Sequence, residues 1–138
     1  MYKYKIPIQV RFKDMDLIGH LNASTYFTYY EATRIAYTQK ILPSVKWNEN
    51  GMIVIKNEMT YKVPIYLHDK VYVSIGMEDL GNTSATVGVI IFKKENDQDI
   101  ICALGYCILV YVDFHINKAI SMPAEWKRAI EQYEEKKW

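Results

Sequence analysis

The sequence has little of what would indicate a disulfide framework or a metal site. It contains 2 cysteines and 3 histidines, and the cysteines lack the CxxC spacing of zinc and redox motifs. Cys102 and Cys107 lie an odd number of positions apart in one strand-like segment, so their side chains should point to opposite faces and cannot pair with each other. We therefore predict two buried structural thiols and no metal site.

Long apolar runs and an excess of charge are also missing. The amino terminus alternates apolar and polar residues, unlike the continuous apolar run of a signal peptide or a membrane span. Lysine and arginine total 17 against 16 for aspartate and glutamate, whereas a nucleic-acid-binding surface concentrates positive charge. We expect a cytoplasmic protein that binds neither a membrane nor nucleic acid.

What the sequence does have is hydrophobic content of 50% in a chain of 138 residues, the usual size of one domain. No repeat or linker interrupts it, so we expect residues 1–138 to form a single domain. Residues 2–12 alternate apolar and polar side chains and predict a strand, which Pro7 makes an edge strand. A helix should follow from about Ala23 to Leu42, with one buried face formed by Tyr26, Tyr29, Tyr30, Thr33, Tyr37 and Ile41.

Four later segments have a period of two and predict long antiparallel strands: residues 52–64, 71–80, 84–94 and 100–112. In the first, the odd-numbered positions from Ile53 to Val63 would form one apolar face on which Asn57 is the only polar residue. An unpaired amide there would be costly, so Asn57 should meet a polar partner or a binding site.

Pro123 then opens a short carboxy-terminal helix with Trp126, Ile130 and Tyr133 on one stripe. The predicted order of elements is an α+β arrangement, in which one antiparallel sheet encloses the long helix. The face of that sheet away from the helix and its edge strands would remain exposed in a monomer, and oligomerisation is the simplest way to bury them.

The polar segment before the long helix, residues 13–22, is where we expect chemistry. Asn22 is a good N-cap, because its side-chain oxygen can accept a backbone N–H of the first helical turn. The free N–H groups near Ala23, at the positive end of the helix dipole, can stabilise an oxyanion. Asp16 can supply a carboxylate beside them, although it could instead cap the helix or pair with Arg11. We interpret Asp14 as structural.

Four motifs follow one another along the chain: Arg11-Phe12-x-Asp14-x-Asp16-x-x-Gly19-His20-x-Asn22, Tyr26-x-x-Tyr30-Glu31-x-x-Arg34, Tyr61-x-x-Pro64 with Asp69-x-Val71, and Gly81-Asn82-Thr83-Ser84. In their order and spacing they resemble the hotdog-fold acyl-CoA thioesterases of the 4-hydroxybenzoyl-CoA thioesterase family. The resemblance implies an antiparallel sheet wrapped round one long central helix, and homodimers or homotetramers with active sites at the subunit interface.

The resemblance further implies hydrolysis of an acyl-CoA, or an acyl carrier protein thioester, without a cofactor. The family's catalytic carboxylate falls on Asp16, and its oxyanion donor is a backbone N–H near Ala23. His20 could be a general base, an orienter of the substrate carbonyl or a plain loop residue. Asn22 could act through its side chain, although capping explains it better.

Candidate substrate contacts extend beyond this loop. The turn at residues 81–83 replaces a basic run that grips CoA in the 4-hydroxybenzoyl enzyme, so Lys62, Lys93 or Lys94 could contact the phosphates instead. The residues expected to bind substrate are Gly19, Tyr26, Asn57, Tyr61, Asn82, Thr83 and Ser84.

Two other functions stay open. A hotdog hydratase or dehydratase would place a histidine five residues after its aspartate, whereas Asp16 to His20 is four and Asp14 to His20 is six. A non-catalytic acyl-CoA-binding module is the second alternative, and the presence of Asp16 and His20 argues against it.

Overall fold

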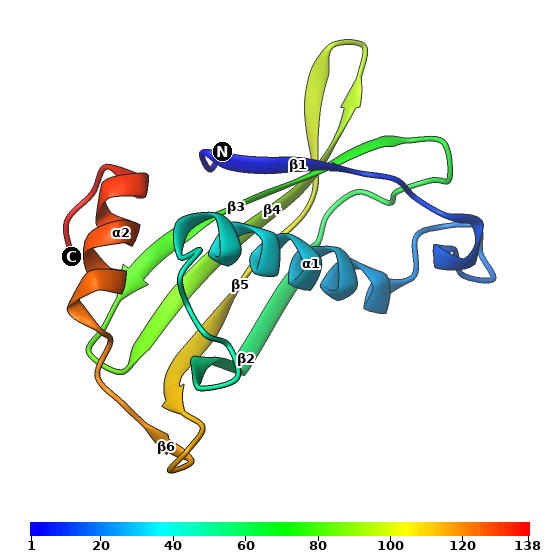
Figure 1. The fold of residues 1–138 in the computed structure, drawn as a ribbon. Helices are drawn as coiled ribbons and strands as arrows, with labels where there is room; N and C mark the ends of the chain where they lie inside the picture. Colours follow the sequence, from blue (N-terminus) through cyan, green and yellow to red (C-terminus); the bar gives the residue numbers. More distant parts are fainter.

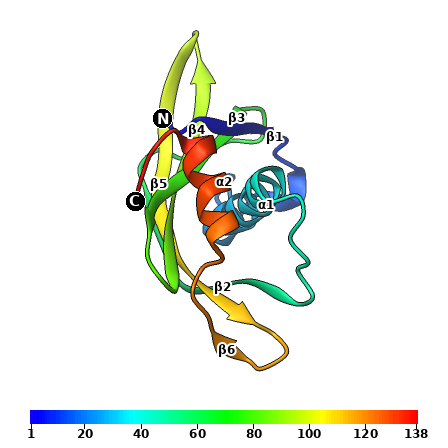
Figure 2. The same ribbon diagram turned by 60° about the vertical axis from the view of Figure 1, so that its left-hand side comes forward.

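The computed structural model describes all residues from 1 to 138. One six-stranded antiparallel sheet, in the order β1-β3-β4-β5-β2 with β6 paired to β5, curves around a long helix (Figures 1 and 2). The elements in chain order are β1 (Tyr4–Ile8), the 3₁₀ turn η1 (Phe12–Asp14), α1 (Ala23–Ile41), β2 (Asn50–Tyr61), β3 (Lys70–Leu80), β4 (Ser84–Glu95), β5 (Gln98–Asp113), β6 (Lys118–Ala119) and α2 (Ala124–Glu134).

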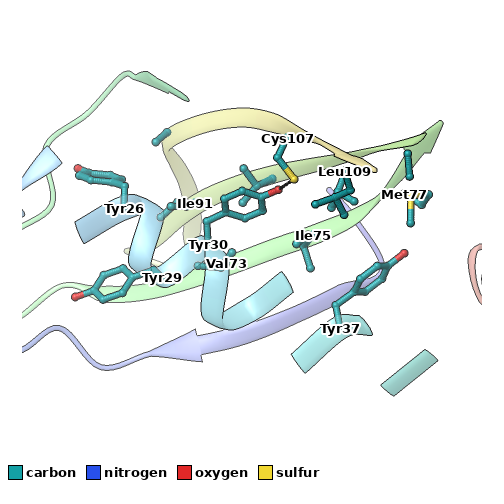
Figure 3. Close-up of a cluster of buried hydrophobic side chains, with 14 of the residues drawn as sticks. Tyr26, Tyr29, Tyr30, Tyr37, Val73, Ile75, Met77, Ile91, Cys107 and Leu109 are labelled. Carbon is teal, nitrogen blue, oxygen red and sulfur yellow. Dashed lines mark hydrogen bonds between the residues drawn. The ribbon is translucent and has the colours of Figure 1, made fainter. Parts of the chain in front are cut away.

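Helix α1 has the start and the buried face that its sequence predicts. The Asn22 side chain accepts the Ser24 N–H at 3.0 Å, and the helix ends at Ile41, two residues before Pro43. The predicted face, from Tyr26 to Ile41, is buried against β3, β4 and β5 (Figure 3). The tyrosine side chains of this face carry hydroxyl groups into the core, and the Tyr30 hydroxyl donates a hydrogen bond to the Cys107 sulfur.

The first strand is shorter than its sequence pattern suggests. Pairing of β1 with β3 ends at Ile8 opposite Val71, and the chain then leaves the sheet to form η1. Phe12 therefore does not continue the buried face, and 84% of its surface is exposed. The edge position inferred from Pro7 is confirmed, because β1 has a neighbour on one side only.

Strand β2 does not keep one apolar face, because a β-bulge lies between Val54 and Lys56. Before the bulge, Met52 and Val54 pair with Tyr111 and Leu109, whose side chains face α1. After it, the helix-facing positions are odd-numbered and start at Asn57. The prediction of a continuous odd-numbered face was wrong for residues 52–55, and Asn57 is exposed without a protein partner.

A second bulge corrects the prediction for the cysteines. Cys102 is the extra residue between the pairs Ile91–Ala103 and Phe92–Ile101, so the alternation that would separate the two thiols is broken. Both thiols are buried in the core and unpaired, as expected, but not on opposite faces. Burial raises the pKa of Cys102 to about 11.

Helix α2 closes one end of the sheet (Figure 2). It begins after Pro123 and buries Trp126 and Ile130, as predicted. The two-residue strand β6 is too short for any sequence pattern to reveal. No helix is long and apolar enough to cross a membrane. A curved antiparallel sheet around one long helix, with a short carboxy-terminal helix, is the hotdog fold expected from the sequence.

Candidate active site

The loop before α1 is anchored by Asp14. Its carboxylate accepts the Tyr29 hydroxyl at 2.6 Å, the Arg11 N–H at 2.9 Å and the Arg11 guanidinium at 3.2 Å. Burial alone would raise the pKa of Asp14, but the hydrogen bonds from Tyr29 and Arg11 outweigh it and lower the pKa. Asp14 is thus a buried structural carboxylate.

Asp16 is held differently. Its Oδ1 accepts the N–H groups of Ile18 at 2.9 Å and His20 at 3.1 Å, while its own N–H donates to the His20 carbonyl at 2.7 Å. Gly19, at φ +88°, provides the left-handed conformation that closes this tight turn. The other carboxylate oxygen makes no hydrogen bond within the chain. Asp16 neither caps the helix nor pairs with Arg11, so that oxygen is free for a ligand.

The first backbone donor of α1, the Ala23 N–H, is free. Asn22 accepts the Ser24 N–H with its side chain and the Thr25 N–H with its carbonyl, at 3.0 and 2.9 Å. No acceptor of the chain engages the Ala23 N–H. An unpaired N–H at the positive end of a helix dipole favours a bound anion.

Asp16 and Ala23 share one cleft of about 370 Å³. Tyr61, at the end of β2, closes it by donating its hydroxyl to the Ala23 carbonyl at 2.9 Å and by packing edge-on against Tyr26 at 4.9 Å. Five predicted site residues are therefore brought together here. The full lining is Asp16, His20, Leu21, Ala23, Tyr26, Tyr61, Lys62, Val63 and Pro64.

His20 lies at the rim of the cleft with its ring packed edge-on against Tyr66, the centroids 5.1 Å apart. Neither ring nitrogen hydrogen-bonds within the chain, so both can reach a ligand. Tyr66 was not singled out from the sequence, because the contact crosses between two loops that no sequence period connects.

The other predicted site residues do not line the cleft. Gly19 shapes the turn, Asn22 is engaged as the cap, and Asn57 is exposed in mid-β2. The turn at residues 81–83 is at the opposite end of the sheet, about 30 Å away along β4. There the Asn82 and Thr83 carbonyls accept the N–H groups of Met122 and Tyr111, and Ser84 begins β4.

Of the three lysines considered for phosphate binding, one borders the cleft. Lys62 lines it, whereas Lys93 is buried and donates to Asp69 at 3.0 Å and to the Pro64 carbonyl at 3.2 Å. Lys94 is 3.8 Å from Asp99 on the surface. The structure contains no cluster of three or more His, Cys, Asp or Glu side chains that could hold a metal ion.

A second hollow lies beside α1, toward its carboxy-terminal half. It also measures about 370 Å³, and its lining comes from the outer side of α1, the following loop and the start of β2. Sequence periodicity missed it, because its members lie outside the predicted buried stripe of the helix. They are Arg34, Ile35, Thr38, Gln39, Trp47 and Met52.

Known proteins resemble this chain over most of its length. The uncharacterized protein YsmA of Bacillus subtilis is 25% identical over 123 residues, which cover 89% of this chain and 82% of that protein. A predicted thioesterase from Bacillus stearothermophilus is 26% identical, with a TM-score of 0.83 and coverage of 98% and 96% of the two chains. A thioesterase of Thermus thermophilus, solved with coenzyme A and zinc, is 27% identical, with a TM-score of 0.83 and coverage of 97% and 96%.

A family model also matches most of the chain. Residues 10–130 fit the model of the thioesterase-like superfamily, a range that includes the Asp16 loop, α1 and all the long strands of the sheet. The chain therefore belongs to the thioesterase-like superfamily.

Proposed function

We propose that this protein hydrolyses acyl-CoA thioesters in the manner of the 4-hydroxybenzoyl-CoA thioesterase family. The observation that carries the proposal is the pairing, in one cleft, of a free Asp16 carboxylate oxygen with the unpaired Ala23 N–H. The Thermus thermophilus relative was solved with coenzyme A, which supports a CoA thioester as substrate.

The reaction follows from these two groups. Asp16 takes a proton from water as the water oxygen attacks the thioester carbonyl, and the Ala23 N–H stabilises the resulting oxyanion. The C–S bond then breaks, and the leaving thiolate recovers a proton. Alternatively, Asp16 attacks directly and forms an acyl anhydride that water hydrolyses. His20 at the rim orients the carbonyl, and Lys62 lies where it can attract the phosphates of CoA.

The decisive test is Asp16→Asn, assayed by free-thiol release from short, long and aromatic acyl-CoAs. We expect turnover to fall at least about 100-fold while the fold is kept, because the amide cannot accept the proton. Asp97→Asn, in the exposed turn between β4 and β5, is the matched control and should leave turnover unchanged. Equal rates for wild type and Asp16→Asn would rule out this mechanism. Hydration of crotonyl-CoA would favour the hydratase or dehydratase alternative. Acyl-CoA binding without thiol release would favour the non-catalytic binding module.

We further propose that the active protein is a homodimer formed along β2. This 12-residue strand is an edge of the sheet, yet its Ile53 and Ile55 are 45% and 60% exposed. An edge strand with an exposed apolar stretch, here Met52–Ile55, tends to pair with another strand. In a two-fold symmetric dimer, β2 of one copy would pair antiparallel with β2 of the other.

A further inference from the structure

The second hollow contains an under-satisfied cation. The Arg34 side chain is only 12% exposed, yet its single charged contact is a distant one of 3.8 Å to Glu31, whose side chain is 65% exposed. None of its five guanidinium N–H groups makes a hydrogen bond within the chain. The side chain is mostly enclosed, but its guanidinium nitrogens still reach solvent, so this cation is available to an anionic group from outside the chain.

The rest of the hollow is suited to an aliphatic chain. Ile35, Trp47 and Met52 provide apolar walls, and the Trp47 ring is held in place by Trp126, 6.4 Å away. An added Cβ on Gly51 would lie 2.9 Å from the Phe114 ring and 3.4 Å from that of Trp47, so glycine allows both rings to lie close over the strand. The hollow, hereafter the Arg34 groove, thus combines apolar walls with the Arg34 cation, and Thr38 and Gln39 complete its lining.

Its position relative to Asp16 depends on how two β2 strands pair. Within one chain, Arg34 lies eleven residues beyond Ala23, about 16 Å along α1. Across an antiparallel pair, helix-facing side chains must lie beside helix-facing side chains. A register that sets Met52 of one copy opposite Tyr61 of the other meets this condition, because both positions face the helix in their own chain. Paired strands are about 5 Å apart and Tyr61 lines the Asp16 cleft, so in that register each groove would adjoin the other copy's Asp16 cleft.

We propose that the groove of one copy binds the acyl chain of the thioester held at Asp16 of the other copy, and that Arg34 selects acyl chains ending in a carboxylate. The proposal rests on the thioesterase function and on the β2 dimer. It identifies the substrate class as ω-carboxyacyl thioesters, since apolar walls beside a guanidinium complement an aliphatic chain with a terminal anion.

Selectivity is tested with octanoyl-CoA and suberyl-CoA, which have equal chain lengths and differ in the terminal carboxylate. Wild type should prefer suberyl-CoA, and Arg34→Gln should lower kcat/KM for it by about 10- to 100-fold with little change for octanoyl-CoA. Arg34→Lys should keep part of the preference. Arg128→Gln, exposed on α2, is the matched control and should change neither value.

The outcomes separate this proposal from the one on which it rests. The proposed selectivity is overturned if wild type hydrolyses octanoyl-CoA at least as well as suberyl-CoA. It is also overturned if Arg34→Gln lowers both activities equally. Neither result contradicts the proposal that the protein is a thioesterase. Absence of thiol release from every acyl-CoA overturns the thioesterase itself. If Arg34→Gln does not fold, the same two substrates are compared in Arg34→Lys and in Met52→Trp, whose larger side chain fills the groove.

The contribution of the second copy is tested by mixing two impaired variants. The Asp16→Asn variant lacks the catalytic carboxylate, and in the Met52→Trp variant the tryptophan side chain blocks the groove. Each homodimer should therefore be inactive on suberyl-CoA. Co-expression should restore about a quarter of wild-type activity, because half of the dimers are mixed and each has one site with both parts intact. No recovery, with mixed dimers demonstrated by differential tagging, would place the groove and Asp16 in the same copy and overturn the proposal.

Discussion

Asp14 and Asp16 show how two carboxylates two positions apart acquire different roles. Asp14 is buried and satisfied by Tyr29 and Arg11, whereas Asp16 uses one oxygen to close a turn and keeps the other free. The difference lies in the 3₁₀ turn, which directs Asp14 toward α1 and leaves Asp16 at the cleft. Sequence alone singles out the pair, but the partners that distinguish them come from the folded helix.

Asp14 should make the protein sensitive to acid. Its pKa is lowered in the folded state from the ordinary value of 3.8, so the native state binds fewer protons than the unfolded chain and this contribution to stability is present above that value. Asp14→Asn should cost about 1–3 kcal/mol at pH 7. The difference from wild type should shrink as the pH falls below about 4. Urea unfolding across this pH range measures it, and a difference that does not depend on pH would contradict the prediction.

At the scale of elements, the start of α1 serves both the fold and the proposed site. Asn22→Ala should lower the free energy of unfolding by about 1 kcal/mol, because the Ser24 N–H loses its acceptor. Asn22→Ser, which retains a cap, should restore most of that stability in urea unfolding. It also tests whether the amide is catalytic: full turnover in Asn22→Ser would confine Asn22 to capping, and lost turnover at normal stability would show a direct role.

The pairing of β2 with β5 depends on Gly105. A Cβ there would clash with the Glu58 carbonyl oxygen and lie 2.9 Å from its carbonyl carbon, and this backbone cannot move without breaking the pairing. Gly105→Ala should therefore destabilise the protein by about 1–3 kcal/mol in urea unfolding.

Gly88→Ala is the matched comparison. The atoms in its way are the flexible side chains of Tyr2 and Glu78, which can move aside, so its cost should be smaller. The reverse order of the two costs would contradict the reasoning from backbone contact.

The elements also show which features a sequence can predict. The buried face of α1 follows directly from its spacing, because a helix keeps its period regardless of neighbours. Strand segments were also located well, but the faces of β2 and the orientation of Cys102 were not. A bulge depends on how two strands fit each other, and its single extra residue leaves no mark in the hydrophobic pattern of either strand.

The same limit applies to the site. The Asp16 loop and the start of α1 are neighbours in sequence, so their juxtaposition was predictable. The Arg34 groove joins the outer side of α1 to Trp47 and Met52 from the following loop and strand, which share no sequence period with the helix, so only the folded structure reveals it.

For the whole molecule, the exposed edge of β2 is the feature to test. Ile55→Lys would place a charge at the centre of the proposed strand pair, which should disfavour pairing without disturbing the core, since Ile55 is exposed in the single chain. We expect a monomer in sedimentation velocity, with folding retained and thioesterase turnover reduced. Ile116→Lys, also exposed but beyond β5, is the control. A variant that remains dimeric would rule out β2 as the interface.

The bulge in β2 has an evolutionary consequence. It separates a stretch whose even-numbered residues face the helix from one whose odd-numbered residues do so. Loss of the single codon for Ile55 would restore strict alternation and leave Met52, Val54, Asn57 and Met59 all on the helix-facing side, because the pairs Val54–Leu109 and Lys56–Ile108 would then be consecutive. Such a deletion would remove the local bend of the strand and keep the wall of the groove. A one-residue deletion elsewhere in β2, away from the bulge, would instead turn part of the strand to the opposite face, so the bulge marks the place where this strand can change length without changing its faces.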